Sequence, residues 1–235
     1  MTNDYYTMLK FLSWNIQQGG GSRVRGILRF IAKQAPHIVV LSEFRNNDTG
    51  IFLRHKLLEQ KYLFQFTSLT TSDTNSVLIA SKLPCASRLF SGLDHAHSVV
   101  AVDFEAFHLY GVYLPHKKKH QLFPLLNKEI TTHAPAMIMG DFNTGKNFID
   151  QKGDSFWYTQ DLLKLEKSGM QDAFRYVHGE VEAYSWYSHQ GNGYRYDHIY
   201  AAKELLPIIK DCDYIHQARE EKLSDHSPMF LEFSV

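Results

Sequence analysis

The stretch MIMGDFNTG, from Met137 to Gly145, ends an apolar run with two side chains that can do chemistry. If the chain stays extended here, Asp141 and Asn143 point to the same side and Phe142 points into the core. A carboxylate and a carboxamide side by side at a strand end can hold a metal ion or a phosphate group. Asp, Asn and Gly are also the usual residues of a polar turn, so this stretch alone leaves both interpretations open.

Other apolar runs in the sequence also carry polar residues at their edges. They are Asn15 in SWNIQ, Glu43 in LSEF, Tyr113 in VYLPH, Asp197-His198 in YRYDH, and Asp225-His226 in LSDHSP. Taken singly, Asn15 and Asp225 can be turn or cap residues, and Tyr113 can be a core aromatic. A carboxylate at Glu43, after a fully apolar run, costs stability unless it is paired or bound to a metal. Because polar groups at strand ends converge on one rim of a sheet, the full set predicts a site.

This set of side chains suits metal-assisted hydrolysis of a phosphodiester. Mg²⁺ (or Mn²⁺) prefers oxygen ligands, keeps waters, and uses one or two carboxylates from the protein. Glu43 and Asp225 supply that charge, with Asn15 as a neutral helper. The sequence contains no Cys/His cluster with zinc spacing and no phosphate-binding loop of the GxxxxGKS type.

The remaining polar residues of the set can perform the catalytic steps. Charge on the phosphate oxygens can be stabilised by Asn143, Tyr113 and a protonated His226. Asp141 is placed to orient or deprotonate the attacking water, and Asp197 can hold the His226 imidazole in one orientation.

Composition indicates a globular protein without a strong overall field. The 235 residues are 44% hydrophobic and 14% aromatic, and 25 basic residues balance 25 acidic ones. A polyanionic substrate must therefore be met by local patches. Cys85 and Cys212 make no disulfide framework, and the N-terminus resembles neither a signal peptide nor a membrane span. We expect a single domain over residues 1–235, in a soluble, cytoplasmic and monomeric protein.

Hydrophobic patterning predicts a mixture of strands and helices. Strands are expected at 8–14, 37–43, 62–66, 76–81, 99–105, 107–114, 137–143, 184–188, 194–202 and 227–235. In the 99–105 run, apolar residues alternate with polar or small ones, as in a half-buried strand. Helices are expected after a cap at Ser22, with Val24, Ile27, Leu28 and Ile31 on one face, near 51–60, across 122–130, and from Tyr158 to Leu165. This pattern favours an α/β sandwich of mixed sheets flanked by helices.

The ordered series WNIQ, LSEF, VYLP, GDFN, YRYDH and SDHSP resembles the endonuclease/exonuclease/phosphatase superfamily, which has the DNase I-like fold. The likeness runs from Trp14 to Pro228. It is closest to exonuclease III and AP endonuclease-type enzymes, because Tyr113 precedes Leu-Pro and because GMQDAFR (169–175), YSW and GYRYDHIYA resemble blocks of that branch. The resemblance implies a four-layered α/β sandwich, with two packed mixed β-sheets flanked by helices.

The resemblance also implies roles for the residues of the set. Glu43 is the main metal ligand, with Asn15 and Asp225 close to the metal. The catalytic residues it implies are Tyr113 and Asn143 as phosphate contacts, Asp141 as the acid/base, and Asp197 and His226 as a coupled pair. The sequence departs from the family at Ser42, where glutamine is usual, and at His116. It also departs in a shorter 116–124 segment and in an 82–98 region that lacks an acidic-Gly-Arg block.

Several basic and aromatic residues beside the set are candidates for substrate binding. Lys117 and Lys118 in HKKKH (116–120), together with Arg23, Arg25 and Lys146, can follow phosphates, although a lysine run can also be a solvated surface. Trp186 and Tyr194, with Tyr184 and Tyr187 nearby, can stack on bases or line a pocket for a base-free sugar.

Three functions are compatible with these observations. The first is a Mg²⁺- or Mn²⁺-dependent nuclease acting on DNA, in repair, with nucleic acid as partner and no membrane association. The second keeps the chemistry but acts as a phosphodiesterase or phosphatase on RNA, lipid head groups or small phosphoesters. The third is a non-catalytic binding protein that retains the fold.

Overall fold

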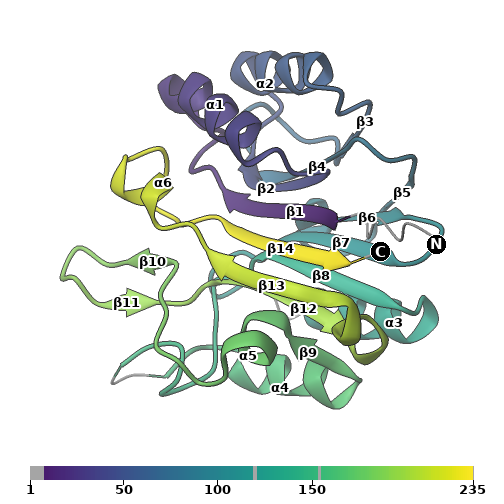
Figure 1. Cartoon of the computed structure of the whole chain (residues 1–235), viewed down its shortest axis with the longest axis vertical. Helices are drawn as coiled ribbons and strands as arrows, with labels where there is room; N and C mark the ends of the chain where they lie inside the picture. The colour runs from purple at the N-terminus through teal and green to yellow at the C-terminus, as the bar shows by residue number, and fades with distance from the viewer. Residues whose placement is uncertain (1–7, 119–120, 153–154, 235) are drawn as a thin grey trace, which may run out of the picture.

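Two six-stranded sheets pack face to face in the computed structural model, and helices cover their outer faces (Figure 1). The structure describes residues 8–118, 121–152 and 155–234. The first sheet has the strand order β13-β14-β1-β2-β4-β3. Its strands are β1 (Met8–Asn15), β2 (Ile38–Phe44), β3 (Phe64–Thr67), β4 (Ser76–Ser81), β13 (Ile209–Tyr214) and β14 (Met229–Ser234).

The second sheet has the strand order β5-β6-β7-β8-β12-β9. Its strands are β5 (Ala86–Leu89), β6 (Val99–Asp103), β7 (His108–Tyr113), β8 (Ala136–Asp141), β9 (Met170–Asp172) and β12 (Asp197–Ala202). A small hairpin of β10 (Trp186–Tyr187) and β11 (Gly193–Tyr194) projects from one edge (Figure 1). Each large sheet contains one parallel pair, β1 with β2 and β7 with β8, among antiparallel neighbours, so both sheets are mixed.

Helices form the two outer layers. α1 (Val24–Gln34) and α2 (Asp48–Glu59) cover the first sheet, and α3 (Leu122–Thr132) and α4 (Thr159–Lys167) cover the second. The shorter α5 (Ala173–His178) packs near β12 and β13, and α6 (Gln217–Glu220) lies in the connection that leads to β14. The predicted four-layered α/β sandwich is therefore confirmed. No helix in the described part of the chain combines the length and the apolar character needed to cross a membrane.

The packing of β2 explains why its sequence is a continuous apolar run. Ile38 and Val40 belong to the core between the sheets, whereas Val39 and Leu41 belong to the core under α1 and α2. Because successive side chains of a strand point to opposite faces, a strand covered on both faces needs apolar residues throughout.

The same packing corrects the prediction of a half-buried strand at 99–105. Val100 and Val102 pack between the sheets, while Val99 and Ala101 pack under the outer helices, and all four are fully buried. The alternation was misleading because Ala101 is fully buried, and because β6 ends at Asp103, so that Glu105 lies outside the strand.

Two further predictions about local structure were wrong. Ser22 does not cap a helix, because it lies in a 3-10 turn, Gly21–Arg23, and α1 begins without a side-chain cap. The predicted strand 194–202 is divided into β11 and β12 at Arg195, which is completely buried. The apolar face of α1 is buried as predicted, whereas β5, β9, β13, α5 and α6 were not predicted.

Candidate active site

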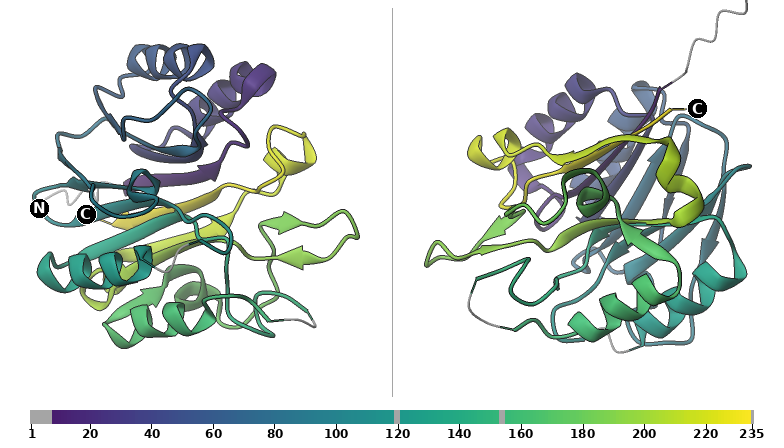
Figure 2. Two further views of the ribbon diagram at one scale, coloured as in Figure 1. Left: turned by 180° about the vertical axis from the view of Figure 1, so that it is seen from behind. Right: turned by 60° about the horizontal axis from the view of Figure 1, so that its bottom comes forward.

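The strand pairings bring the predicted residues to one edge of the sandwich, from which α6 and the β10–β11 hairpin also project (Figures 1 and 2). β1 and β2 end together, with Asn15 opposite Ser42, and β7 and β8 end together, with Tyr113 opposite Asp141. The antiparallel β12 begins at this edge, with Asp197 opposite Asp141. Asp197 therefore starts a strand where the sequence had suggested a strand end.

Asp141 and Asn143 form a tight polar turn at the end of β8. The backbone N–H of Asn143 donates to Oδ1 of Asp141 at 2.8 Å, and its Nδ2 donates to Oδ2 at 3.0 Å. Asn143 has a φ of 47°, so the extended chain does not continue to this residue. Phe142 is buried as expected. The two readings left open by the sequence are thus not exclusive, since the turn itself holds both polar side chains at the rim.

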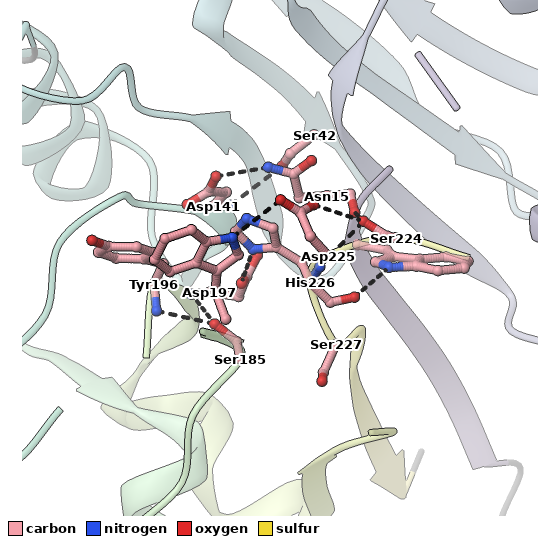
Figure 3. A network of polar contacts seen from close by, with 12 residues as sticks. Asn15, Ser42, Asp141, Ser185, Tyr196, Asp197, Ser224, Asp225, His226 and Ser227 are labelled. Atoms are coloured by element: carbon pink, nitrogen blue, oxygen red, sulfur yellow. Dashed lines mark hydrogen bonds and ion pairs between the residues drawn. The ribbon is translucent and has the colours of Figure 1, made fainter. Parts of the chain in front are cut away.

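The Asn15 amide connects the two sheets across the rim (Figure 3). Its Nδ2 donates to Oδ2 of Asp141 at 2.9 Å and to Oε1 of Glu43 at 3.0 Å. Its Oδ1 accepts the backbone N–H of Gln17 at 2.8 Å. One carboxamide therefore holds two carboxylates close together, which without such a shared donor would repel each other.

A β-bulge directs Glu43 to this edge. The β2–β4 register shifts between Ser42 and Phe44, and Glu43 has a φ of 56°. Bulges next to active sites commonly re-aim a side chain. The Gln18 N–H donates to Oε2 of Glu43 at 2.7 Å, from a loop that passes through left-handed conformations at Gly19 and the two glycines that follow it.

His226 and Asp197 form a buried pair beside Asp141 (Figure 3). Nδ1 of the imidazole lies 2.7 Å from Oδ2 of Asp197. Burial alone would lower the pKa of His226, but the carboxylates of Asp197 and Asp141 raise it to about 10. Burial and the neighbouring Asp197 raise the pKa of Asp141 to about 7, against the opposing effect of His226. The cluster therefore holds a proton donor and a carboxyl whose pKa is close to neutral.

Asp225 lies beside this pair on the segment that leads into β14. The indole N–H of Trp186 donates to its Oδ2 at 3.1 Å. The guanidinium of Arg23 is close enough to both Asp225 and Glu43 for each to act on its pKa. The two carboxylates that the sequence suggested for the metal thus both lie near the Arg23 guanidinium at the rim.

Tyr113 is half-buried at the end of β7. Burial, Glu43 and Asp141 all raise the pKa of its phenol, so it remains a neutral hydrogen-bond donor at ordinary pH. His198, which the sequence grouped with Asp197, is not at the rim. It points into the opposite side of β12, where its Nε2 lies 2.8 Å from the carbonyl oxygen of Thr144.

Ser42, the departure from the family pattern, joins the two sheets beneath the rim. Its hydroxyl donates to the carbonyl oxygen of Val112 at 2.8 Å and accepts the N–H of Asp141 at 3.3 Å. It is completely buried. The short side chain of Ser42 can therefore hold the backbone of Asp141 in place from the neighbouring sheet.

The donor set fits a hard divalent cation. Glu43 and Asp225 offer carboxylate oxygens with unused lone pairs, and Asn15 offers an amide oxygen. Asp141, Asp197 and His226 also present ligand atoms that lie within 4.8 Å of one another. Asp197 already holds Nδ1 of the His226 imidazole, however, so the first group, which offers only oxygen atoms, fits a hard cation better.

The predicted substrate-binding residues lie on this side of the molecule with differing partners. Arg23 donates to the carbonyl oxygens of Leu223 and Gln17, each at 2.6 Å. The rings of Trp186 and Tyr194 pack at 5.7 Å between centroids. Lys117 and Lys118 are exposed, and residues 119 and 120 of the same run lie outside the described residues.

Two other predicted cations are engaged elsewhere. Lys146 forms an ion pair with Glu166 at 2.6 Å, and the guanidinium of Arg25 lies 5.0 Å from the ring centroid of Phe52. Neither contact involves a residue of the Asp197–His226 pair or of the predicted metal ligands.

A buried ionic cluster behind the site was not found from the sequence. Arg195, completely buried, donates through Nε to Asp150 at 2.7 Å and pairs with Asp172. Arg175 reaches the same Asp150 at 2.7 Å. The cluster ties the turn after β8 to β9, α5 and the start of β12. Only the strand-like context of Arg195 could have signalled it, because an arginine inside an otherwise buried strand needs paired acids.

The sequence and the fold of this chain are similar to those of known proteins. The model of the endonuclease/exonuclease/phosphatase family matches residues 12–226. An exodeoxyribonuclease of Streptococcus pneumoniae is 24% identical over 173 residues, covering 62% of this chain and 62% of that protein. A DNA-(apurinic or apyrimidinic site) endonuclease of Dictyostelium discoideum is 20% identical over 254 residues, covering 94% of this chain and 69% of that protein. The match thus spans less than two thirds of the pneumococcal relative.

Solved structures show the same fold. A 3′-5′ exonuclease, NExo, from Neisseria meningitidis has a TM-score of 0.84 at 24% identity, covering 97% of this chain and 100% of that chain. An AP endonuclease from Archaeoglobus fulgidus has a TM-score of 0.80 at 20% identity, with the same coverage of both chains.

Proposed function

Since the chain belongs to the endonuclease/exonuclease/phosphatase family, we propose that it is a divalent-metal-dependent DNA nuclease of the exonuclease III/AP endonuclease type. The similar proteins named as exodeoxyribonuclease and AP endonuclease support this reaction and this substrate. The ion is Mg²⁺ or Mn²⁺, because oxygen-rich sites with few carboxylates suit these cations. Two free cysteines fit a reducing cytoplasm, where the enzyme acts as a monomer.

One observation carries the proposal: the buried Asp197–His226 pair lies beside Asp141, which shares the Asn15 amide with Glu43. A packed core does not require several carboxylates and an imidazole to be gathered at one rim. Burying charged groups is unfavourable unless they are paired, and such gatherings of perturbed groups are typical of active sites.

Each polar residue of the site has a separate role in hydrolysis. Asp141, with a pKa of about 7, accepts a proton from the attacking water or returns one to the leaving oxygen. The cationic His226 directs its Nε2–H to a phosphate oxygen, because its Nδ1 is held by Asp197. Tyr113 adds a neutral donor to the same oxygens. The amide of Asn143 donates to Asp141 and to the carbonyl oxygen of Leu114 in this structure, so it contacts a phosphate oxygen only by exchanging one of these bonds.

Glu43 and Asp225, with Asn15, are the residues that hold the cation. When bound, the ion polarises the phosphate oxygens and neutralises their charge in the transition state. The Gln18 N–H and the Asn15 amide keep the Glu43 carboxylate in place, and Trp186 does the same for Asp225. Such outer contacts orient metal ligands and are important for affinity.

A second candidate keeps the chemistry and changes the substrate to RNA, a lipid head group or a small phosphoester. The balance of 25 basic and 25 acidic residues favours it, since no global field attracts a long polyanion. The basic and aromatic residues on the side of the site favour DNA, because they can meet phosphates and bases locally.

A panel of labelled substrates tests the choice. It contains intact duplex DNA, single-stranded DNA, duplex with one abasic site, DNA with a 3′-phosphate, single-stranded RNA and small phosphoesters, each in Mg²⁺, Mn²⁺ and EDTA. We expect metal-dependent cleavage of DNA that EDTA abolishes. Turnover of RNA or small phosphoesters with no action on any DNA would contradict the proposal.

A further inference from the structure

Two large aromatic side chains face solvent on the loop that follows Asn143. The described parts of this loop, 144–152 and 155–158, connect β8 to α4 and lie toward the same edge as the β10–β11 hairpin (Figure 2). Phe148 is 78% exposed and Trp157 is 58% exposed. Single exposed apolar residues are common, but two large rings on one loop beside a catalytic rim need a reason.

The backbone that carries these rings is fixed. Oδ1 of Asn147 accepts the N–H of Phe156 at 2.7 Å and the hydroxyl of Thr159 at 2.9 Å. The hydroxyl of Thr144 donates to the carbonyl oxygen of Trp157. Hydrogen bonds from polar side chains of the loop and of Thr159 therefore hold its backbone in place, while the Trp157 ring is exposed to solvent.

Phe148 is held in an unfavourable conformation. Its φ is 66°, in the left-handed region that a bulky residue rarely adopts. Strain of this kind persists only where surrounding contacts impose it, and it concentrates at functional positions. Burial of the ring does not compensate for it, because the ring is exposed.

Positive charge accompanies the aromatic surface. The ammonium of Lys117 lies 4.9 Å from the ring centroid of Trp157, and Lys118 beside it is exposed. Rings flanked by cations are the arrangement by which proteins hold single-stranded nucleic acid, since bases stack on the rings while phosphates meet the cations.

A row of rings connects this surface with the catalytic pair. Phe156 packs against Tyr196 at 5.9 Å between centroids, and Tyr196 packs against Trp186 at 5.6 Å. Trp186 in turn lies 6.5 Å from the His226 ring. Phe156 directly precedes Trp157 in the chain, so this row of half-buried rings leads from the loop that carries the exposed rings to the catalytic pair.

We propose that Phe148 and Trp157 form a stacking platform for unpaired bases of the DNA strand whose phosphodiester lies at His226, an inference that rests on the proposed function. A fully paired duplex offers free base faces only at its ends. The enzyme therefore prefers DNA with unpaired nucleotides next to the cut, such as a single strand, an overhang or a frayed end.

Binding of labelled oligonucleotides in EDTA, followed by fluorescence anisotropy, tests this platform. Phe148→Ala and Trp157→Ala each weaken binding to a single strand by about 10-fold, the loss expected for one stacked base, and change binding to a blunt duplex little. Trp157→Phe retains affinity, because phenylalanine also stacks. Tyr176→Ala, which removes a 43% exposed ring from α5, is the matched control and leaves both affinities unchanged.

A lysine variant and tryptophan emission separate stacking from charge. Lys117→Gln weakens single strand and duplex alike and reduces the salt dependence, as loss of a phosphate contact does. Base stacking on Trp157 quenches its emission, so the quenching on addition of oligonucleotide diminishes in Trp157→Phe even though binding persists.

The outcomes distinguish this inference from the function on which it rests. Wild-type protein that neither binds nor cuts any DNA overturns both. Wild-type protein that cuts DNA, with Phe148→Ala and Trp157→Ala binding a single strand as tightly as the wild type, overturns the platform alone.

Discussion

His226 and Asp197 form a buried ion pair in which Nδ1 of the imidazole lies 2.7 Å from a carboxylate oxygen. They come from different sheets, since Asp197 starts β12 and His226 precedes β14. The pair therefore depends on the two sheets being packed in the correct position. Trp14 adds to this by donating its indole N–H to the carbonyl oxygen of His226 at 3.0 Å.

Asp197→Asn removes the charge that keeps His226 protonated. Nearly the same shape remains, so we expect a folded protein whose kcat on DNA falls by roughly 10²–10⁴-fold, the range over which a positioned proton donor acts. Steady-state cleavage of a labelled oligonucleotide measures the loss. Asp213→Asn, which changes a half-buried carboxylate in β13, is the control. Unchanged kcat in Asp197→Asn would exclude the pair from catalysis.

Asn15→Ala deprives Glu43 and Asp141 of the donor they share. The two carboxylates then repel each other, and the position of Glu43 relaxes. We expect an affinity for the metal that is about 10–100-fold weaker, seen as a rise in the Mg²⁺ concentration that gives half-maximal cleavage. Asn192→Ala, on the exposed β10–β11 connection, should leave this concentration unchanged. Equal Mg²⁺ requirements in Asn15→Ala and wild type would show that the bridge does not organise the metal site.

Ser42→Ala breaks the bridge between the sheets beneath Asp141. Loss of a buried hydrogen bond lowers the free energy of unfolding by about 1–2 kcal/mol, and the freed Asp141 backbone lowers kcat as well. Ser81 is equally buried and donates to the carbonyl oxygen of Leu83 at 2.8 Å. It lies at the end of β4, whereas Ser42 pairs with Val77 near the start of that strand. Ser81→Ala should therefore reduce stability alone. Denaturant unfolding and cleavage rates, measured on both variants, test this; parallel losses of activity would contradict it.

The buried cluster predicts how stability depends on pH. Burial would raise the pKa of Asp172, but the Arg195 guanidinium outweighs it and holds that pKa far below its usual range. In the unfolded chain the same carboxyl has a pKa of about 3.9. The unfolded state therefore takes up the proton first, so stability is complete above about pH 5 and falls as the pH decreases toward the folded pKa.

Asp172→Asn removes this dependence. It leaves the Arg195 charge without one partner, so we expect the free energy of unfolding at pH 7 to fall by about 3 kcal/mol. Its further loss between about pH 5 and pH 3 should be smaller than in the wild type. Asp94→Asn, at an exposed carboxylate, should behave as the wild type does. A wild-type free energy of unfolding that is constant over this range would contradict the interpretation.

The convergence of polar groups on one rim could be predicted from the sequence because it follows from the strands themselves. Asn15, Glu43 and Asp141 each end an apolar run that is long enough to be a buried strand, and parallel strands bring such ends together. What could not be predicted is the detail created by local exceptions. The bulge that turns Glu43 and the left-handed Asn143 have no hydrophobic period to signal them.

Other features depended on contacts distant in the sequence. The cluster of Asp150, Asp172 and Arg195 joins three segments, and apart from an arginine within a predicted strand no segment looks unusual by itself. Ser42 differs from the usual family residue. Its hydroxyl donates to the carbonyl oxygen of Val112, which the packing of the second sheet brings next to it.

The most direct test of the metal-dependent site is the Mg²⁺ dependence of DNA cleavage by wild type, Glu43→Gln and Glu59→Gln. Glu59 is an exposed residue of α2, so its variant controls for loss of a carboxylate as such. We predict that wild type and Glu59→Gln cleave in Mg²⁺ and not in EDTA. Glu43→Gln should have an unchanged circular dichroism spectrum and unfolding midpoint, but should cleave DNA in Mg²⁺ about 100-fold more slowly than the wild type, or slower still. Cleavage by Glu43→Gln at the wild-type rate, or by the wild type in EDTA, would contradict the account.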